Sequence, residues 1–185
     1  MTESRSRKDK NGNVFKAYLG DIYNSQLLVV GRPSASSSAL TNNEEAYWRS
    51  INGYQAWAQT SNNYNRQRTI YVGANNGILH AFNADSGEEM WGFVPPLIAS
   101  RLPEVINPTA ANGSQGGTNP LFLVDGSPTV HDTYFKHPIT NKTDWYTLLM
   151  VNYGRGGAGF TTLDITNPQK PLHLYSVLND PVSEK

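Results

Sequence analysis

The sequence contains no cysteine among its 185 residues. This absence excludes disulfide bonds, thiolate metal sites and thiol nucleophiles, but it does not identify the compartment, because many exported bacterial proteins also lack cysteine. No run of about 18 apolar residues is present, so the sequence predicts no membrane-spanning helix. The polar start, MTESRSRKDKNGN, has no apolar segment behind it, and we expect any export signal to lie outside this sequence or to be missing.

Net charge is lacking as well, since fifteen Lys and Arg residues balance fifteen Asp and Glu residues. Without a net field, or a basic patch beyond the N-terminal tail, the sequence does not favour nucleic acid or an anionic membrane as a partner. What is abundant is Gly (16), Pro (11) and Tyr (10), while only 16% of the residues are charged. This composition is typical of many short strands joined by tight turns, so the predicted class is all-β.

The N-terminal segment differs from the rest of the chain. Residues 1–17 are rich in Ser, Arg and Lys without apolar spacing, so we expect a disordered polar tail there. Residues 18–185 form the expected folded domain.

One segment of that domain has helical periodicity. The residues near a 3.6-residue period are Ala46, Tyr47, Ile51, Tyr54, Trp57 and Ala58. This pattern predicts an inserted helix at about 44–59, with Asn43 as its N-cap. Gly53 in its middle costs roughly 1 kcal/mol relative to Ala, so packing of the aromatic face has to stabilise the helix.

A repeat relates two parts of the chain. IYVGANNGILHAFNADSGEEMWGF, residues 70–93, and LLMVNYGRGGAGFTTLDITNPQKPLHLYSV, residues 148–177, each show an apolar strand, a glycine turn, a second strand, another turn and a closing aromatic strand. A further strand precedes each unit, in NSQLLVV and GSPTVHD. Asn83 and Asp164 then take equivalent places in the two units.

A four-stranded antiparallel unit that repeats is typical of a β-propeller blade. The units are longer than the usual ~40–45 residues because helices or loops are inserted after the first strand. Two blades cannot close a ring of at least about four, and each would have an unpaired edge and a bare apolar face. The sequence therefore predicts a partial β-propeller of about two blades with a short inserted helix.

The small polar residues and glycines of the repeats are interpreted as structural. Asn-Asn-Gly and Asp-Ser-Gly sequences tolerate the positive φ of tight hairpins, and Asp-Gly-Ser indicates a turn or bulge in which the Asp side chain accepts backbone N–H groups. The predicted turn or bulge residues are Asn75, Asn76, Gly77, Asp85, Gly87, Asp125, Gly126, Gly156, Gly157 and Asp164.

Motifs for catalysis or cofactors are weak. Residues 154–159 fit G-x-G-x-x-G, but dinucleotide binding needs a helix after the glycines, and the following FTTLDIT predicts a strand. The histidines lack zinc-binding spacing, and no G-x-S-x-G is present. We therefore assign no catalytic, cofactor-binding or metal-binding residue in this sequence.

The four tryptophans, Trp48, Trp57, Trp91 and Trp145, are interpreted as packing residues rather than as a sugar-binding platform. Exposed aromatic side chains on the inserted segments would change that interpretation. We expect partner contacts on two inserted segments, residues 32–66 and 97–120.

Four stretches together carry a family resemblance. They are LGDIYNSQLLVVG, RTIYVGANNGILHAFNADSGEEMWGFVPP, LFLVDGSPTVHD and WYTLLMVNYGRGGAGFTTLDITNP, in this order over about residues 18–168. In combination they resemble the C-terminal propeller of the type IV pilus tip-associated adhesin and biogenesis factors, the PilC/PilY family. The resemblance implies a non-enzymatic role in pilus assembly and surface attachment, at the cell surface, outer membrane or pilus tip. The implied partners are the remaining propeller blades or the rest of the parent protein, pilus subunits, and a surface or host receptor.

The resemblance implies a calcium site, but in a part of the propeller outside this sequence. Family members typically carry an Asp-rich, EF-hand-like loop in the part of the propeller that would follow Lys185. No D-x-[DN]-x-[DN]-G loop with a Glu at position twelve occurs here, so calcium is not assigned to any residue of this chain.

Two alternatives stay open. AFNADSGEEMW alone also resembles the repeat of quinoprotein dehydrogenase propellers, which bind pyrroloquinoline quinone. A structural subunit of an appendage or a virus is the other alternative, because it can use the same fold.

Overall fold

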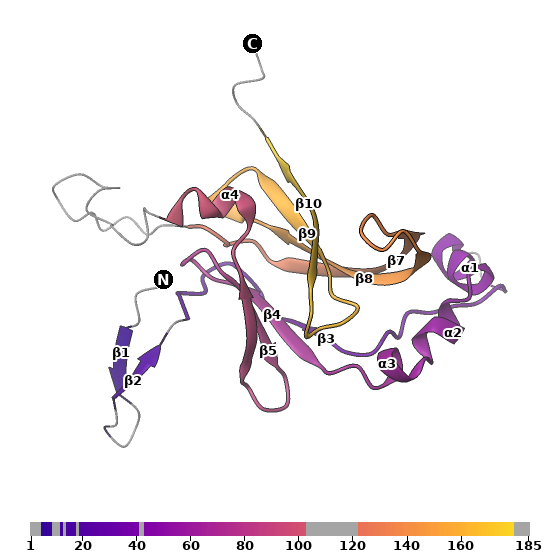
Figure 1. The fold of residues 1–185 in the computed structure, drawn as a ribbon, viewed down its shortest axis with the longest axis horizontal. Helices are drawn as coiled ribbons and strands as arrows, with labels where there is room; N and C mark the ends of the chain where they lie inside the picture. The colour runs from indigo at the N-terminus through magenta and orange to yellow at the C-terminus, as the bar shows by residue number, and fades with distance from the viewer. Residues whose placement is uncertain are drawn as a thin grey trace, which may run out of the picture.

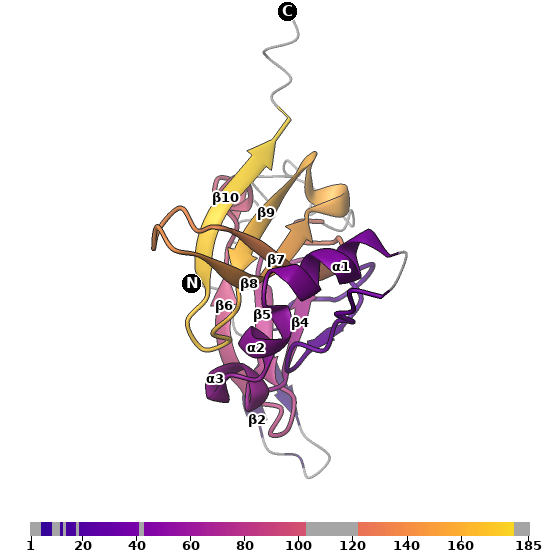
Figure 2. The ribbon, with the colours of Figure 1, turned by 90° about the vertical axis from the view of Figure 1, so that its right-hand side faces the viewer.

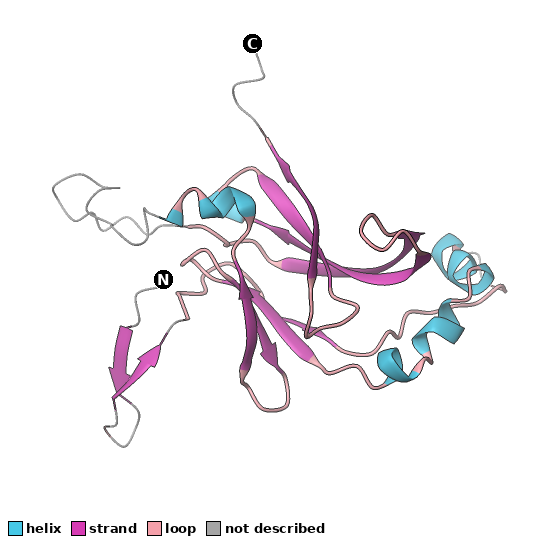
Figure 3. Cartoon of the chain, in the orientation of Figure 1, coloured by secondary structure: helices cyan, strands magenta, loops and turns pink. Residues whose placement is uncertain are grey.

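The computed structural model of the chain contains two four-stranded antiparallel sheets (Figure 1). The structure describes residues 5–8, 12, 14–17, 19–40, 43–102 and 122–179. The strands of the first sheet, in spatial order, are β3 (Leu28–Val30), β4 (Thr69–Gly73), β5 (Leu79–Asn83) and β6 (Glu89–Phe93). Those of the second, from one edge to the other, are β7 (Pro128–Lys136), β8 (Thr143–Asn152), β9 (Gly159–Asp164) and β10 (Leu172–Leu178). Spatial neighbours are also sequence neighbours, so both sheets are meanders, and the predicted all-β class with two four-stranded antiparallel units is confirmed (Figure 3).

Short turns with the expected residue types join the strands of the first sheet. Between β4 and β5, the N–H of Gly77 donates to the carbonyl of Ala74 at 3.0 Å, and Gly77 has φ +89°. Glycine adopts this left-handed conformation without the steric cost that a Cβ would add. Between β5 and β6, the Asn83 side-chain oxygen accepts the N–H groups of Asp85 (2.8 Å) and Ser86 (3.2 Å).

One apolar core lies between the two sheets. Its buried members are Val30, Tyr71, Leu79, Ala81, Ile98, Leu123, Val124, Leu149, Val151, Tyr153, Leu163 and Ile165. They come from both sheets, from the segment before β7, and from α4 (Pro96–Ala99), a short helix that follows β6. Burying an aliphatic or aromatic side chain of this size stabilises the fold by about 1.5–3 kcal/mol, so this core holds the two sheets together.

Polar contacts add to the contact between the sheets. The indole N–H of Trp91 in β6 donates to the carbonyl of Pro168, after β9, at 2.7 Å. The backbone N–H and the side-chain amide of Asn24 donate to the two Asp125 carboxylate oxygens at 3.2 Å and 2.6 Å. The segments that lead into β3 and β7 are thus tied to each other.

The opposite faces of the two sheets carry exposed apolar side chains. Val29 in the first sheet is 57% exposed, and Met150, Tyr175 and Val177 in the second are 42%, 48% and 48% exposed. Residues alternate between the faces of a strand, so these side chains point away from the shared core. The face of each sheet opposite the shared core is therefore only partly covered, since Val72 and His80 in the first sheet and Thr162 in the second are buried there.

The predicted inserted helix at about 44–59 is wrong in one respect, because two short helices replace it and a third follows them. They are α1 (Glu44–Ile51), α2 (Tyr54–Ala58) and α3 (Ser61–Tyr64). Gly53 has φ +68° and separates α1 from α2, because glycine enters the left-handed region freely and so ends a helix. The N-cap prediction is confirmed, since the Asn43 side-chain oxygen accepts the N–H of Ala46 at 3.0 Å. No helix in the described part of the chain is both long enough and apolar enough to cross a membrane.

The inserted helices belong to the first sheet in sequence but pack on the second. They connect β3 to β4, and Figure 2 shows α1 and α2 beside β7 and β8. A second apolar cluster joins Tyr54, Trp57 and Ala58 of α2 to Trp145 of β8. The hydroxyl of Tyr54 also donates to the Asp132 carboxylate in β7 at 2.6 Å.

The prediction of a disordered tail over residues 1–17 also needs correction. Strands β1 (Arg5–Lys8) and β2 (Val14–Ala17) pair antiparallel, with Arg5 opposite Ala17 and Lys8 opposite Val14. A polar sequence can still form a hairpin, because backbone hydrogen bonds and a glycine in the turn stabilise it. Gly12, between the two strands, has φ +85°. Figure 1 shows this hairpin apart from the two main sheets.

Candidate functional site

The predicted turn residues of the first repeat lie between its strands. Asn75, Asn76 and Gly77 connect β4 to β5, and Asp85 and Gly87 connect β5 to β6. A hydrogen bond from the Arg68 guanidinium, 2.6 Å from the Asp85 carboxylate, lowers the pKa of Asp85. Both side chains of this ion pair are largely exposed, so it belongs to the solvated end of a hairpin.

The predicted turn residues of the second repeat are more enclosed. Asp125 and Gly126 precede β7, and Gly156 and Gly157 lie in the turn between β8 and β9. Asp164 ends β9, where one carboxylate oxygen accepts the N–H and hydroxyl of Thr166 at 2.8 and 2.6 Å and the other lies 3.3 Å from Nε2 of His137. None of the ten predicted turn residues lines the pocket described next.

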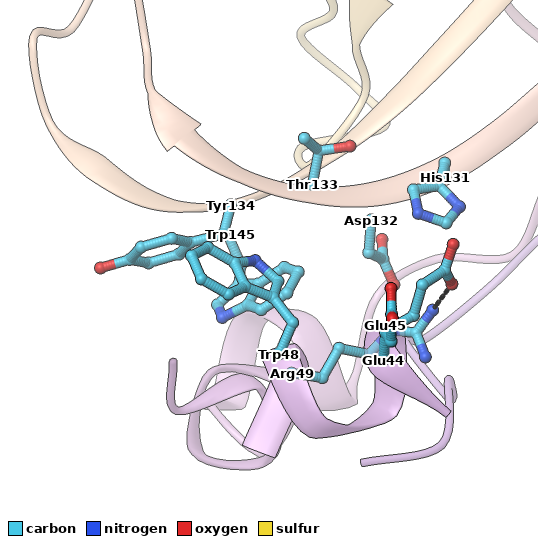
Figure 4. Close-up of a pocket in the computed structure, with 9 residues that line it drawn as sticks. All are labelled: Glu44, Glu45, Trp48, Arg49, His131, Asp132, Thr133, Tyr134 and Trp145. Carbon is cyan, nitrogen blue, oxygen red and sulfur yellow. Dashed lines mark hydrogen bonds and ion pairs between the residues drawn. The ribbon is translucent and has the colours of Figure 1, made fainter. Parts of the chain in front are cut away.

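A pocket of about 400 Å³ lies between α1 and β7 (Figure 4). Its lining residues are Glu44, Glu45, Trp48, Arg49, His131, Asp132, Thr133, Tyr134 and Trp145. They come from the insertion of the first sheet and from two strands of the second, so the pocket forms only because the insertion docks on the neighbouring sheet.

Helical spacing places the α1 side chains of the pocket. The Asn43 cap starts the helix at Glu44, and residues four apart lie on the same side of a helix. Glu44 and Trp48 form one such pair. Glu45 and Arg49 form another, joined by an ion pair of 2.6 Å.

One half of the pocket is aromatic. The ring of Trp48 is edge-on to that of Tyr134, with centroids 6.4 Å apart, and Trp48 remains 50% exposed. Trp145 behind them is only 3% exposed, and its indole N–H donates to the Asn52 carbonyl at 2.8 Å. The aromatic wall therefore rests on a buried tryptophan and presents a half-exposed one.

The other half of the pocket is charged. Figure 4 shows Glu44, Glu45, Arg49, His131 and Asp132 gathered opposite the aromatic rings. Besides its ion pair with Glu45, Arg49 donates to the Ser36 carbonyl at 3.0 Å, and its side chain is only 11% exposed. These contacts hold the guanidinium in one position.

Asp132 is fixed from behind the pocket. Its carboxylate accepts the hydroxyls of Tyr54 and Thr147, each at 2.6 Å. The Thr147 hydroxyl also accepts from Arg66 at 2.6 Å, and burial lowers the pKa of the Arg66 guanidinium. This network is buried on the protein side, so the carboxylate has a defined orientation.

Two buried tyrosines give a test of the packing at high pH. Burial raises the pKa of Tyr71 from 10.0 to about 12, and burial together with the hydrogen bond to Asp132 raises the pKa of Tyr54 as well. Between roughly pH 10 and 12 the unfolded chain therefore loses these protons while the folded chain keeps them. Folding stability should fall by up to about 1.4 kcal/mol per pH unit for each tyrosine.

Urea unfolding at a series of pH values, followed by tryptophan fluorescence, measures this slope. The Tyr71→Phe variant should show a shallower decline above pH 10 than the unmodified chain. An identical decline in both proteins would contradict the assignment to Tyr71.

The chemistry of the pocket suits binding. No group of three or more His, Asp or Glu side chains that could hold a metal ion occurs among the described residues. The hydroxyl groups that line the pocket are those of Thr133 and Tyr134, and neither is hydrogen-bonded to a base within the described residues. An aromatic wall facing fixed carboxylates is suited to holding a ligand in one orientation.

The pocket residues were not identified from the sequence. The expected contact segment 32–66 includes α1, whereas residues 103–120 of the other expected segment, 97–120, lie outside the described residues. The packing interpretation fits Trp57 and Trp145, which are buried, but not Trp48. The feature of the sequence that could have indicated the pocket is a tryptophan close to two acidic residues on an inserted segment.

Comparison with known proteins gives the family. A model of the PilY1 beta-propeller domain matches residues 19–180. The chain belongs to the PilY1 β-propeller family. The resemblance to the PilC/PilY family that the sequence motifs carry is thereby confirmed, and the two stacked sheets are parts of a PilY1-type propeller.

Named PilY1 relatives match nearly the whole chain. The chain is 34% identical over 178 residues to a type IV pilus biogenesis factor PilY1 homolog of Xylella fastidiosa (strain Temecula1), covering 92% of this chain and 13% of that protein. It is also 34% identical over 174 residues to the type IV pilus biogenesis factor PilY1 of Pseudomonas aeruginosa (strain PAO1), again covering 92% and 13%. The chain thus spans about an eighth of the length of these PilY1 relatives.

A solved PilY1 structure is similar in fold to this chain. The crystal structure of the Pseudomonas aeruginosa PilY1 C-terminal domain matches 80% of this chain and 24% of that chain, with a TM-score of 0.54 and 26% sequence identity. The match covers a minor part of that domain, as expected when two sheets of a larger PilY1 propeller are compared.

Proposed function

We propose that this chain is a non-enzymatic part of a type IV pilus biogenesis factor and serves as a rigid scaffold for pilus assembly and surface attachment. The observation that carries the proposal is the family match over residues 19–180, together with relatives that are named pilus biogenesis factors. The place of action is the cell surface, at the outer membrane or the pilus.

The fold supports a scaffold role. A continuous core joins the two sheets, and the inserted helices are anchored on the second sheet by buried aromatic residues. A rigid core of this kind holds the surface segments in fixed positions while they contact partners. The exposed apolar faces that carry Val29 and Met150 suit the remaining propeller blades, which we propose as the first partners.

Pilus subunits and a surface or host receptor are the further partners that we propose. The inserted segment that carries α1 is the part of the chain best suited to meet them, because it projects from the sheets and displays aromatic side chains. No EF-hand-like loop occurs in the sequence, so we propose that the calcium implied by the family resemblance binds elsewhere in the parent protein.

Deletion of the gene in the source bacterium tests this function. We expect the deletion strain to show few surface pili, measured by electron microscopy and by pilin in the sheared surface fraction, and reduced attachment to an abiotic surface. Complementation with the unmodified gene should restore both.

A matched control separates scaffold from catalysis. Complementation with a gene that carries Glu89→Gln, at an acid that pairs with His80 outside the pocket, should restore pili whenever the protein is present at the normal level, because the proposed role needs no acid or base. Normal piliation and attachment in the deletion strain would refute the proposal.

A further inference from the structure

The pocket between α1 and β7 has more negative than positive groups. Three carboxylates, Glu44, Glu45 and Asp132, share it with one guanidinium, Arg49. Arg49 is already paired with Glu45. Glu44 has no hydrogen bond or ion pair with any residue in the described part of the chain, and it is exposed. A cation is the complementary charge for such a pocket.

The acids alone have a simple structural explanation. Acidic residues in the first turn of a helix interact favourably with its dipole, so Glu44 and Glu45 suit the start of α1 without any ligand. That explanation does not cover the opposite wall. Trp48 keeps half of its surface exposed beside a cavity, although Trp57 on the next helix is almost fully buried.

Aromatic rings and carboxylates on facing walls fit one kind of group well. A lysine or arginine side chain has an apolar stem that packs on an aromatic ring and a cationic head that pairs with carboxylates. The aromatic rings lie on one side of the pocket and the acids on the other, so the stem and the head of such a side chain would each contact a complementary surface (Figure 4). An anionic group would instead face three carboxylates.

The surroundings of the pocket indicate a protein rather than a small amine. Tyr47 and Ile51 on the same helix, outside the pocket lining, are 50% and 55% exposed. Tyr, Trp and Arg are the residues most enriched where partner proteins bind, and the contacts around such residues exclude water.

We propose that the pocket between α1 and β7 receives a lysine or arginine side chain from a partner protein, with its stem on Trp48 and Tyr134 and its cation at Glu44. This proposal specifies which side chain of a partner protein would bind here. It rests on the proposed role in assembly and attachment, because that role supplies the protein partner. Binding is measured on the purified chain, so its failure is distinct from a failure to form pili.

The test uses a short basic peptide and an uncharged control peptide of the same length. The purified ¹⁵N-labelled 185-residue chain is titrated with acetyl-Gly-Leu-Lys-Leu-Gly-amide or with the same peptide containing norleucine in place of lysine. The indole N–H signal of Trp48, assigned by its loss in Trp48→Ala, reports binding. We expect the lysine peptide to shift this signal and to bind at least about 3-fold more tightly than the norleucine peptide, and the difference to shrink at about 1 M salt.

Variants separate the two walls of the pocket. Glu44→Gln should weaken binding of the lysine peptide by about 3-fold and leave the norleucine peptide unchanged. Trp48→Ala, followed by the other pocket signals, should weaken it by about 5-fold. Glu88→Gln removes an exposed acid from the turn between β5 and β6 and should have no effect.

Three outcomes would overturn the proposal. They are equal binding of the lysine and norleucine peptides, no change in Glu44→Gln, and no shift of the Trp48 signal with the lysine peptide. A shift of that signal by a neutral oligosaccharide such as maltopentaose, without a response to lysine, would overturn it too and assign the aromatic wall to a sugar.

Discussion

The Gly156→Ala variant should be less stable than the unmodified chain by about 3 kcal/mol, which lowers the thermal midpoint by roughly 10 °C. Gly156 lies in the turn between β8 and β9 and is buried. A Cβ at this position would stand 1.8 Å from the Leu123 carbonyl oxygen and 2.8 Å from the Leu123 Cα. These are backbone atoms of a core segment, so the clash cannot be relieved by turning a side chain.

The matched control is Gly31→Ala. Its Cβ would meet only the Arg68 side chain, at 3.3 Å, and that side chain is flexible and largely exposed. We expect a change of less than about 1 kcal/mol. Thermal and urea unfolding, followed by circular dichroism, compare the two variants. Equal stability of Gly156→Ala and the unmodified chain would show that the segment before β7 does not pack against this turn as the structure has it.

The sheets were predictable because their signals are local. Each glycine turn lies between two apolar runs of strand length, and the second repeat shows the same order of strands and turns as the first. Residues such as Gly77 and Asn83 fix hairpins through their own backbone and side-chain geometry, without help from distant parts of the chain. The number and pairing of the strands in the two four-stranded sheets therefore followed from the sequence, whereas the β1–β2 hairpin did not.

The end of α1 was harder to predict, because the sequence indicated only the energetic cost of Gly53 within a helix. Gly53 was assigned a cost within a continuous helix, whereas the backbone uses its freedom to enter the left-handed region and start a new helix direction. The periodic residues on either side of Gly53 consequently do not share one face. Tyr54 is 1% exposed, but Tyr47 and Ile51 are at least half exposed.

The pocket depends on contacts that no local pattern reveals. Trp48 and Trp145 are 97 positions apart in the chain, and nothing in the residues around either one indicates that α1 lies against β7. Tryptophan suits both a buried core and an exposed wall, so composition alone does not distinguish the two environments. Packing of the insertion on the second sheet decides which of the four tryptophans is exposed.

That packing is tested by Trp145→Ala, which should destabilise the docked insertion by about 3–5 kcal/mol. Trp145 is 3% exposed, its ring lies 4.9 Å from that of Tyr54, and its N–H holds the Asn52 carbonyl between α1 and α2. Its removal takes away a large apolar surface and leaves that carbonyl without its partner. Hydrogen exchange followed by mass spectrometry should show loss of protection over α1 to α3.

The strands of the first sheet should stay protected in the same Trp145→Ala protein, because their core residues, such as Tyr71 and Leu79, belong to a different apolar cluster from Trp145. Trp48→Ala serves as the control, since a half-exposed tryptophan on the same insertion should cost about 1 kcal/mol and leave protection over α2 and α3 intact. Loss of protection throughout β4 to β6 in Trp145→Ala would mean that the insertion and the first sheet unfold as one unit. The insertion would then be part of the cooperative fold of the sheet from which it emerges, and the pocket would open only when that sheet unfolds.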